Sequence, residues 1–270
     1  MTQNMKIQLF QFNLQPADTK ANQNKIESLF SNQLDSDTEI AVIPEMWNNS
    51  YALEELHNLA DEDLKVSLPF IQKLSRKYHV AIVAGSVSNS RDNQVYNTAF
   101  TVDKNGELLY QYDKIHLVPM LDEHLFLNGG DKVPYAFQLT PEVKASQIIC
   151  YDLRFPEIAR HPAVNGANIL FYVAEWPKAR LNHWRTLLQS RAIENDIFVV
   201  ACNSCGFEKE DGTEYAGHSM VINPNGEIIA EAGEKEEVIT VDIDLSEVET
   251  QRKNIPVFDN RKPSLYQYDN

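Results

Sequence analysis

Short β-rich runs and helix-like segments alternate along nearly the whole chain, and few folds accommodate such an order. Runs rich in Val, Ile, Phe and Tyr predict strands at residues 6–12, 39–43, 80–86, 96–102, 108–112, 143–150, 168–173, 197–202, 219–222, 227–230 and 238–243. Apolar residues at helical spacing predict helices at 19–34, 53–60, 68–78, 156–164, 179–195 and 245–252. The interleaving favours an α/β class, and two late hairpins, one of them turning at 223–226, require antiparallel pairing.

The length of 270 residues and the 43% hydrophobic content suit one domain with a substantial core. No composition shift, low-complexity tract or internal repeat divides the chain, so we predict a single domain over residues 1–270. Its tail, from about residue 254 to 270, mixes apolar with polar residues, which suits a segment that crosses onto a partner subunit.

The net charge of −15 is spread along the chain and indicates a solvated surface that repels polyanions, so nucleic acid is not an expected partner. No apolar stretch approaches the ~20 residues of a membrane span, and the N-terminal segment lacks the apolar region of a signal peptide. Three cysteines, an odd number, fit a reducing compartment in which thiols stay free. We therefore expect a cytoplasmic protein without a membrane partner.

Three predicted strands end at side chains whose chemistry is complementary. Glu45 follows the run 40–43, Lys114 follows the run 107–113, and Cys150 ends the run 143–150. If these strands are neighbours in one sheet, a carboxylate, an ammonium and a thiol converge at its edge. The carboxylate can remove the thiol proton, which matters because a thiol of pKa ~8.5 is only a few per cent thiolate at neutral pH. The ammonium can stabilise the thiolate and the oxyanion that forms when sulfur attacks a carbonyl carbon.

Each of these residues also has a simpler interpretation. An unpaired cysteine such as Cys150 is commonly a small buried hydrophobe. Glu45 and Lys114, taken singly, are typical of surface charges or of a structural ion pair. The catalytic interpretation depends on the three residues occurring together.

The motifs around these residues resemble those of the nitrilase (carbon-nitrogen hydrolase) superfamily. They are PEM at 44–46, YDKIHL at 112–117, CYDLRFPE at 150–157, AEWP at 174–177, RAIEN at 191–195 and GHSMVINPNG at 217–226. The resemblance implies a four-layer α-β-β-α sandwich with the active site at the strand ends. It also implies a triad in which Glu45 is the general base, Lys114 the electrostatic stabiliser and Cys150 the nucleophile. Family members pair through helices beside the active site, so we expect a homodimer.

The resemblance implies further site residues. A second glutamate, Glu123, would orient the lysine and the substrate amide; the alternative is a surface acid beside Asp122. Tyr151 would contribute its backbone N–H to the oxyanion hole, whereas its side chain would serve core packing. No cofactor and no metal is required.

Substrate selection is predicted to rest on residues near the nucleophile. The guanidinium of Arg154, four residues after the cysteine, can hold a substrate carboxylate through two hydrogen bonds. The alternative is a structural ion pair with Asp152 or Glu157. Trp47 and Trp176 are candidate pocket walls, although a tryptophan after a strand is more often part of the core.

Cys202 and Cys205 form a Cys-x-x-Cys pair that follows a predicted strand instead of opening a helix. A redox pair or a zinc site is weakly supported, because a zinc site needs a fourth ligand. The histidines lack metal-ligand spacing, and His116 is predicted to satisfy a buried polar partner.

Within the superfamily the chain most resembles the ω-amidases, which hydrolyse the terminal amide of 2-oxoglutaramate. The stretches DKIHLVPMLDEHL at 113–125 and WPKARLNHW at 176–184 carry that resemblance. The expected reaction is amide hydrolysis through a cysteine thioester, on a small-molecule amide that bears a carboxylate. The alternatives are an N-carbamoyl amino acid amidohydrolase and, from another class, a catalytically idle ligand-binding member.

Overall fold

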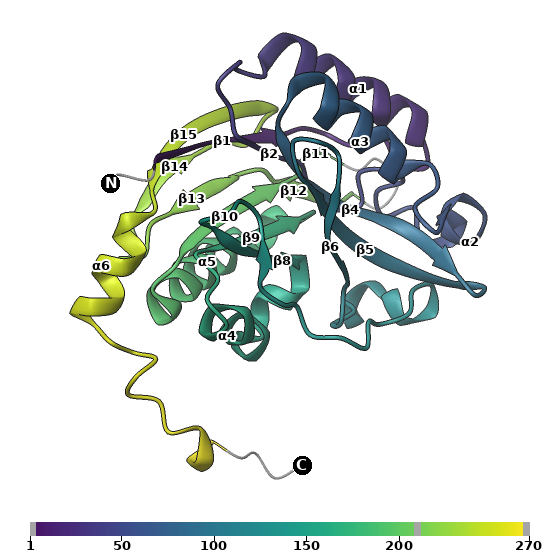
Figure 1. The fold of residues 1–270 in the computed structure, drawn as a ribbon. Helices are drawn as coiled ribbons and strands as arrows, with labels where there is room; N and C mark the ends of the chain where they lie inside the picture. The colour runs from purple at the N-terminus through teal and green to yellow at the C-terminus, as the bar shows by residue number, and fades with distance from the viewer. Residues whose placement is uncertain (1–3, 208–211, 267–270) are drawn as a thin grey trace.

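The computed structural model describes residues 4–207 and 212–266, which form two β-sheets stacked face to face between outer helices (Figure 1). The first sheet consists of β1 (Asn4–Gln11), β2 (Ile40–Val42), β3 (Asp61–Glu62), β4 (Ala81–Arg91), β5 (Gln94–Val102), β6 (Leu108–Asp113) and β15 (Glu237–Asp244). The second consists of β7 (Phe137–Gln138), β8 (Lys144–Ile149), β9 (Ile169–Ala174), β10 (Phe198–Asn203), β13 (Met220–Ile222) and β14 (Ile228–Glu231). Two short strands, β11 (Cys205–Phe207) and β12 (Glu214–Ala216), pair separately.

The helices lie outside the two stacked sheets. They are α1 (Thr19–Gln33), α2 (Leu56–Leu59), α3 (Ser67–Tyr78), α4 (Pro156–Val164), α5 (Leu181–Asn195) and α6 (Ser246–Asn254). The 3-10 turns are η1 (Leu53–Glu55), η2 (Pro119–Leu121), η3 (Glu123–Leu125), η4 (Cys150–Arg154), η5 (Lys178–Arg180) and η6 (Pro263–Leu265). α1 and α3 cover the first sheet, whereas α4 and α5 cover the second (Figure 1).

Apolar spacing explains how the layers hold together. The buried residues of α3 include Ile71 and Leu74, which lie on one face of the helix and pack on the first sheet. Every residue of β9 and β10 is buried, as expected for central strands that are covered on both faces. Burial of each large apolar side chain contributes roughly 1.5–3 kcal/mol. The predicted four-layer α-β-β-α sandwich is confirmed.

Strand direction brings several strand ends to one edge of the sandwich. β1, β2 and β4 are parallel neighbours, and β6 is reached from β4 through two antiparallel pairings, so it runs in the same direction as β2. In the second sheet β8, β9 and β10 are parallel. The final strand, β15, pairs antiparallel with β1 over its whole length. The chain therefore completes its first sheet only with its last strand.

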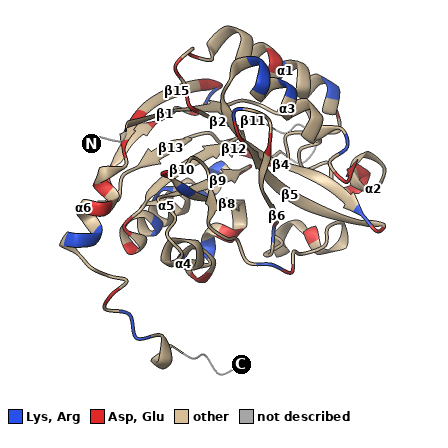
Figure 2. Cartoon of the chain, viewed as in Figure 1, with Lys and Arg blue, Asp and Glu red and all other residues tan. Residues whose placement is uncertain are grey.

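The surface carries both signs of charge. Figure 2 shows basic and acidic residues together on α1 and α6. In residues 4–207 and 212–266, no helix combines the length and apolar character needed to span a bilayer. After α6 the chain leaves the body of the domain (Figure 1), and Ile255, Leu265 and Tyr266 are exposed there.

Candidate active site

The three predicted catalytic residues meet, but they do not come from one sheet. Glu45 follows β2 and Lys114 follows β6, both in the first sheet, whereas Cys150 follows β8 in the second. The condition under which convergence was considered, three neighbouring strands in one sheet, is therefore not met. The sheets are stacked, so the strand ends converge across the interface between them. An apolar run shows that a strand is buried, but it does not show which of two stacked sheets contains it.

The Glu45 carboxylate is fully buried and accepts hydrogen bonds from three neutral donors as well as from Lys114. Its Oε1 accepts hydrogen bonds from the Tyr51 hydroxyl and from Nδ2 of Asn97, each at 2.8 Å. Its Oε2 accepts the backbone N–H of Glu175 at 2.8 Å. These contacts fix the carboxylate in one orientation beside the Cys150 thiol.

Gly85 makes room for the backbone that leads to Glu45. Its φ is +55°, and a Cβ added there would lie 1.8 Å from the Pro44 carbonyl oxygen. Only glycine can combine this conformation with this close approach. The pairing of β4 with β5 is irregular at the same place, and Oγ of Ser86 accepts the N–H of Met46 at 3.0 Å.

Lys114 is also fully buried and sits between two carboxylates. Its Nζ lies 3.3 Å from Oε1 of Glu45 and 3.0 Å from Oε1 of Glu123, and it donates to the Tyr51 hydroxyl at 3.0 Å. Burial alone would lower the pKa of Lys114, but the two carboxylates outweigh burial and raise that pKa above its ordinary value. The side chain is therefore an ammonium at neutral pH.

Glu123 is turned inward and contacts Lys114. It begins η3, is fully buried, and its Oε2 accepts the N–H of Val118 at 2.8 Å. The alternative of a surface acid is wrong for Glu123. Its neighbours Met120 and Leu125 are 70% and 68% exposed, so one short loop presents a buried carboxylate and an apolar rim.

Cys150 is the first residue of η4 and has a left-handed φ of 40°, a strained conformation for a residue with a Cβ. Burial raises the pKa of the Cys150 thiol well above its usual range, and Glu45 raises it further, while Lys114 acts in the opposite direction. The resting sulfur is therefore protonated, with a carboxylate beside it to receive the proton.

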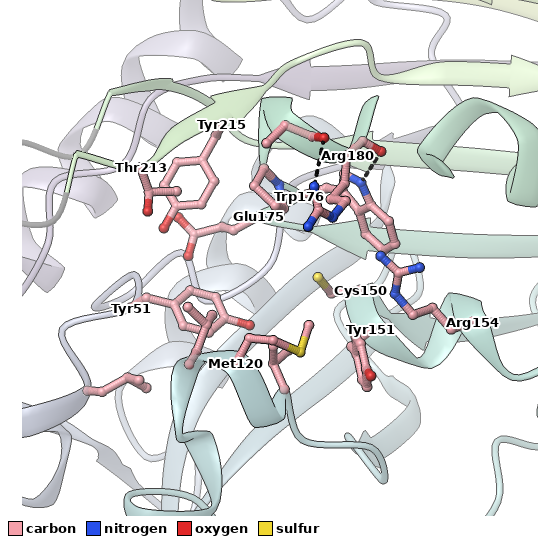
Figure 3. A pocket seen from close by; sticks show the side chains of 15 residues that line it. Tyr51, Met120, Cys150, Tyr151, Arg154, Glu175, Trp176, Arg180, Thr213 and Tyr215 are labelled. Atoms are coloured by element: carbon pink, nitrogen blue, oxygen red, sulfur yellow. Dashed lines mark hydrogen bonds between the residues drawn. The ribbon is translucent and has the colours of Figure 1, made fainter. Parts of the chain in front are cut away.

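A pocket of about 380 Å³ opens over the sulfur (Figure 3). Apolar side chains form much of its wall, namely Leu53, Val118, Met120, Leu121, Pro177 and Ala179. Two guanidinium groups, those of Arg154 and Arg180, lie at the same pocket. An amide at the sulfur and an anionic group farther along would both find complementary surfaces here.

Arg154 lies over aromatic rings and is not in a structural ion pair. Its guanidinium carbon is 4.8 Å from the Trp176 ring centroid and 5.6 Å from that of Tyr151, and its Nη1 is 3.3 Å from Nδ1 of His183. Within residues 4–207 and 212–266, no carboxylate lies within ion-pair distance of Arg154, and the predicted alternative partner Asp152 contacts His116 instead. The alternative of a structural ion pair is wrong in the described structure.

The two predicted pocket tryptophans have different places. Trp176 lines the pocket, and its Nε1 donates to the Arg180 carbonyl at 2.9 Å. Trp47 does not: it is fully buried between the first sheet and α3, packs 5.7 Å from the Phe70 ring, and donates to the Ala84 carbonyl. The chain turns at Met46, where φ is 48°, and this turn directs the next side chain to the outer face.

Sequence reasoning missed Tyr51, Asn97 and Arg180 as site residues. The sequence did offer one signal for Arg180, its place in the segment 176–184 that carried the ω-amidase resemblance.

Tyr151 lines the pocket, and its ring packs edge-on against Phe155. The predicted oxyanion role of its backbone N–H remains a prediction.

Cys202 and Cys205 are predicted to be dispensable for catalysis. Both are buried free thiols, burial raises both pKa values, that of Cys205 to about 12, and Cys202 donates to the Phe10 carbonyl at 3.4 Å. We expect Cys202→Ala and Cys205→Ala to keep kcat/KM within about twofold and to lose roughly 1 kcal/mol of stability from lost packing. Ammonia release and thermal unfolding measure the two effects. A large loss of activity with normal stability would point to a redox role instead.

Comparison with known proteins places this site in a family. The model of the carbon-nitrogen hydrolase family matches residues 6–253. A Staphylococcus aureus protein named hydrolase in agr operon is 52% identical over 97% of this chain and all of its own length. A 2-oxoglutaramate amidase of Bacillus subtilis is 42% identical over 96% of this chain and 98% of its own.

A solved structure agrees with these sequence relationships. The crystal structure of Saccharomyces cerevisiae Nit3, a member of branch 10 of the nitrilase superfamily, is 29% identical and superposes with a TM-score of 0.85 over 97% of each chain. The matched regions include all three strand ends that lead to the buried carboxylate, ammonium and thiol. The chain therefore belongs to the carbon-nitrogen hydrolase family of the nitrilase superfamily, and it is an enzyme that hydrolyses amides.

Proposed function

We propose that this enzyme is an ω-amidase that converts a dicarboxylic monoamide, such as 2-oxoglutaramate, to the dicarboxylate and ammonia. The observation that carries the proposal is the guanidinium of Arg154, which lies in the same pocket as Cys150 and pairs with no carboxylate among the described residues. The 42% identity to a 2-oxoglutaramate amidase supports the same substrate class.

The first half of the proposed reaction forms a thioester. Glu45 removes the proton from Cys150 as the sulfur attacks the amide carbon, and the carbonyl electrons move to oxygen. The ammonium of Lys114 and the backbone N–H of Tyr151 stabilise that oxyanion. The C–N bond then breaks, and the proton held by Glu45 passes to nitrogen, so that ammonia leaves.

The second half returns the enzyme to its starting state. Glu45 removes a proton from water, and the resulting hydroxide attacks the thioester carbon. The C–S bond breaks, and the sulfur regains its proton from Glu45. Glu123 holds the Lys114 ammonium toward the oxyanion during both halves, which its 3.0 Å contact supports. One carboxylate thus serves twice as a base and twice as an acid.

Arg154→Lys is expected to lower kcat/KM for an acidic ω-amide by at least about tenfold. A charge-assisted hydrogen bond contributes roughly 1.5–3 kcal/mol, and lysine cannot reproduce the two-point contact of a guanidinium. Steady-state ammonia release from 2-oxoglutaramate and from a neutral amide of equal length measures the effect, and the neutral amide should lose much less activity.

Arg180→Lys is the matched control for this measurement. Arg180 lines the same pocket, and its Nη1 donates to the neighbouring Ala179 carbonyl. If only Arg180→Lys selectively lowers kcat/KM for the acidic amide, the substrate carboxylate binds at Arg180 and not at Arg154. Equal losses on both substrates in Arg154→Lys would show that Arg154 only supports the loop.

An N-carbamoyl amino acid is the second candidate substrate, because it also places a carboxylate a few atoms from a C–N bond and would suit the same pair of guanidinium groups. A panel of ω-amides, carbamoyl amino acids and nitriles, scored by ammonia release, separates the candidates. The highest kcat/KM on a carbamoyl compound would replace the ω-amidase assignment. Stoichiometric binding of these compounds without turnover would indicate a catalytically idle binder.

We also propose that the enzyme is a homodimer. The tail beyond α6 extends from the body of the domain and exposes apolar residues, of which Leu265 is 77% exposed and Ile255 is 53% exposed. A contact with a second copy would bury them. Light scattering at micromolar protein concentration should give twice the monomer mass, and a monomer mass would contradict the proposal.

A further inference from the structure

We propose that Asp152, His116 and Tyr112 form a clamp between the two sheets, and that this clamp positions Lys114 against Cys150. The role rests on the proposed chemistry of those two residues. None of the three clamp residues is part of the pocket over the sulfur. They would therefore act on the reaction as positioning residues, through the two loops that they join.

The clamp joins the residues next to the catalytic pair. Asp152 lies two residues after Cys150, and His116 lies two residues after Lys114. Oδ1 of Asp152 accepts the backbone N–H of His116 at 3.0 Å and contacts its Nδ1 at 2.7 Å. Only one residue therefore separates each end of the clamp from the reacting group on its loop, Tyr151 on one loop and Ile115 on the other.

Tyr112 completes the clamp from the other side of Lys114. Its hydroxyl donates to Oδ2 of Asp152 at 2.7 Å and accepts the N–H of Ile115 at 3.3 Å. Burial, with the nearby Asp152 carboxylate, raises the pKa of Tyr112, so its hydroxyl keeps the proton that it donates. The Asp152 carboxylate is therefore hydrogen-bonded to a residue before Lys114, Tyr112, and to a residue after it, His116.

The clamp is rigid because its parts are buried or stacked. Asp152 is fully buried, and a buried carboxylate is strongly unfavourable without donors, which keeps these hydrogen bonds in place. The His116 ring stacks on Phe155 with centroids 3.5 Å apart and planes 8° apart. Since the Asp152 carboxylate can only accept, Nδ1 of His116 is the donor in their contact.

Stacked sheets need such a connection for catalysis. The hydrophobic effect is not directional, so apolar packing between the sheets does not by itself set the geometry in which Lys114 meets Cys150. A misplacement of about 1 Å in a catalytic group can cost ~100-fold in rate. Cys150 also needs restraint, because its left-handed φ of 40° persists only where neighbouring contacts hold it.

The test compares variants of the clamp in the full-length enzyme. Asp152→Asn and His116→Leu remove the carboxylate or its side-chain donor, whereas His116→Asn keeps an N–H close to the position of Nδ1. We expect the first two variants to lower kcat on the best ω-amide by at least about tenfold with KM within about twofold. His116→Asn should recover most of the lost kcat.

Thr101→Val is the matched control. Oγ1 of Thr101 on β5 donates to Oε1 of Gln147 on β8 at 2.9 Å, and both side chains are fully buried. This bond also joins the two sheets on the strand that leads to Cys150, but it lies within the strands instead of at the catalytic loops. Thr101→Val should lower the melting temperature and leave kcat unchanged.

Alkylation of Cys150 by iodoacetamide supplies a readout that does not require turnover. Peptide mass mapping identifies the modified thiol. Asp152→Asn and His116→Leu should slow its alkylation at least about fivefold at fixed pH, because thiol deprotonation depends on alignment with Glu45 and Lys114.

The outcomes separate the clamp from the proposed function. Slower alkylation in an enzyme that hydrolyses none of the amides tested would support the clamp and overturn the ω-amidase assignment. Unchanged alkylation and kcat in Asp152→Asn and His116→Leu, with only a lower melting temperature as in Thr101→Val, would overturn the clamp. Failure of His116→Asn to recover activity while His116→Leu is impaired would overturn the hydrogen-bonding role of Nδ1.

Discussion

Cys150→Ala is expected to reduce amide hydrolysis by at least about a thousandfold while the protein stays folded, because loss of a nucleophile typically has an effect of this size or larger. In the proposed reaction the sulfur forms the thioester, and Cys150 lines the pocket (Figure 3). The substitution removes one small group from a site that is 5% exposed, so the fold should persist. Ammonia release under substrate saturation and circular dichroism are the measurements.

Glu45→Gln should have a comparable effect on turnover, because an amide cannot take the thiol proton. Its oxygen can replace only one of the two accepting oxygens, since both Oε1 and Oε2 of Glu45 accept hydrogen bonds. An alanine variant of Cys150 that kept more than about a thousandth of wild-type activity would refute the covalent route. A glutamine variant of Glu45 that formed thioester but failed to release it would restrict the base role to the second half of the reaction. A rapid-quench experiment distinguishes these cases.

Lys114→Met is expected to damage both stability and catalysis. The methionine has a similar length but leaves Glu45 and Glu123 buried without their cation, and breaking a buried pair in this way costs about 3–5 kcal/mol. That cost is a large part of the about 5–15 kcal/mol by which a domain is stable. Loss of the oxyanion contact should lower kcat by a further ~100-fold or more. Urea unfolding and steady-state kinetics measure the two effects separately.

The pH dependence of this effect follows from the direction of the shift. The folded pKa of Lys114 is raised above its ordinary value, so the stability that the ammonium provides is fully present below that ordinary value. It is lost only as pH rises through the higher folded pKa. The difference in unfolding free energy between wild type and Lys114→Met should therefore not shrink between pH 7 and pH 9.

Glu123→Gln in the Lys114→Met background is the control for the charge argument. It removes one of the two carboxylates left without a partner, so it should recover part of the lost stability, and a double-mutant cycle measures the coupling. No recovery, or a Lys114→Met variant as stable as wild type, would show that the buried ammonium is not needed to balance these carboxylates.

The fold was predictable where local pattern and burial agree. The long strands and α1, α3, α4, α5 and α6 lie within a few residues of their predicted bounds, since each presents a continuous apolar run or stripe. The two-residue β3 and β7 and the three-residue β11 and β12 were missed, because such short segments carry no periodicity. Residues 53–60, predicted as one helix, form η1 followed by α2.

Site residues were predictable only where they lie within a recognisable sequence motif. Glu45, Lys114, Cys150 and Glu123 lie in recognisable segments, so the sequence indicated them as candidates. Tyr51 was missed because its contact with Lys114 spans 63 residues, and no local signal reports such a distance. Trp47 was wrongly placed at the pocket for a different reason. The left-handed turn at Met46 redirects its side chain, and residue types alone do not reveal that turn.

The pairing of β15 with β1 has a consequence for synthesis on the ribosome. One edge of β1, the first strand to emerge, stays unpaired until residues 237–244 have been synthesised and have formed β15. Until then a nascent chain that already contains Glu45, Lys114 and Cys150 presents an open strand edge, which is a template for aggregation. Release of the C-terminal segment thus closes the domain, and enzyme truncated before β15 should depend on chaperones and accumulate in inclusion bodies.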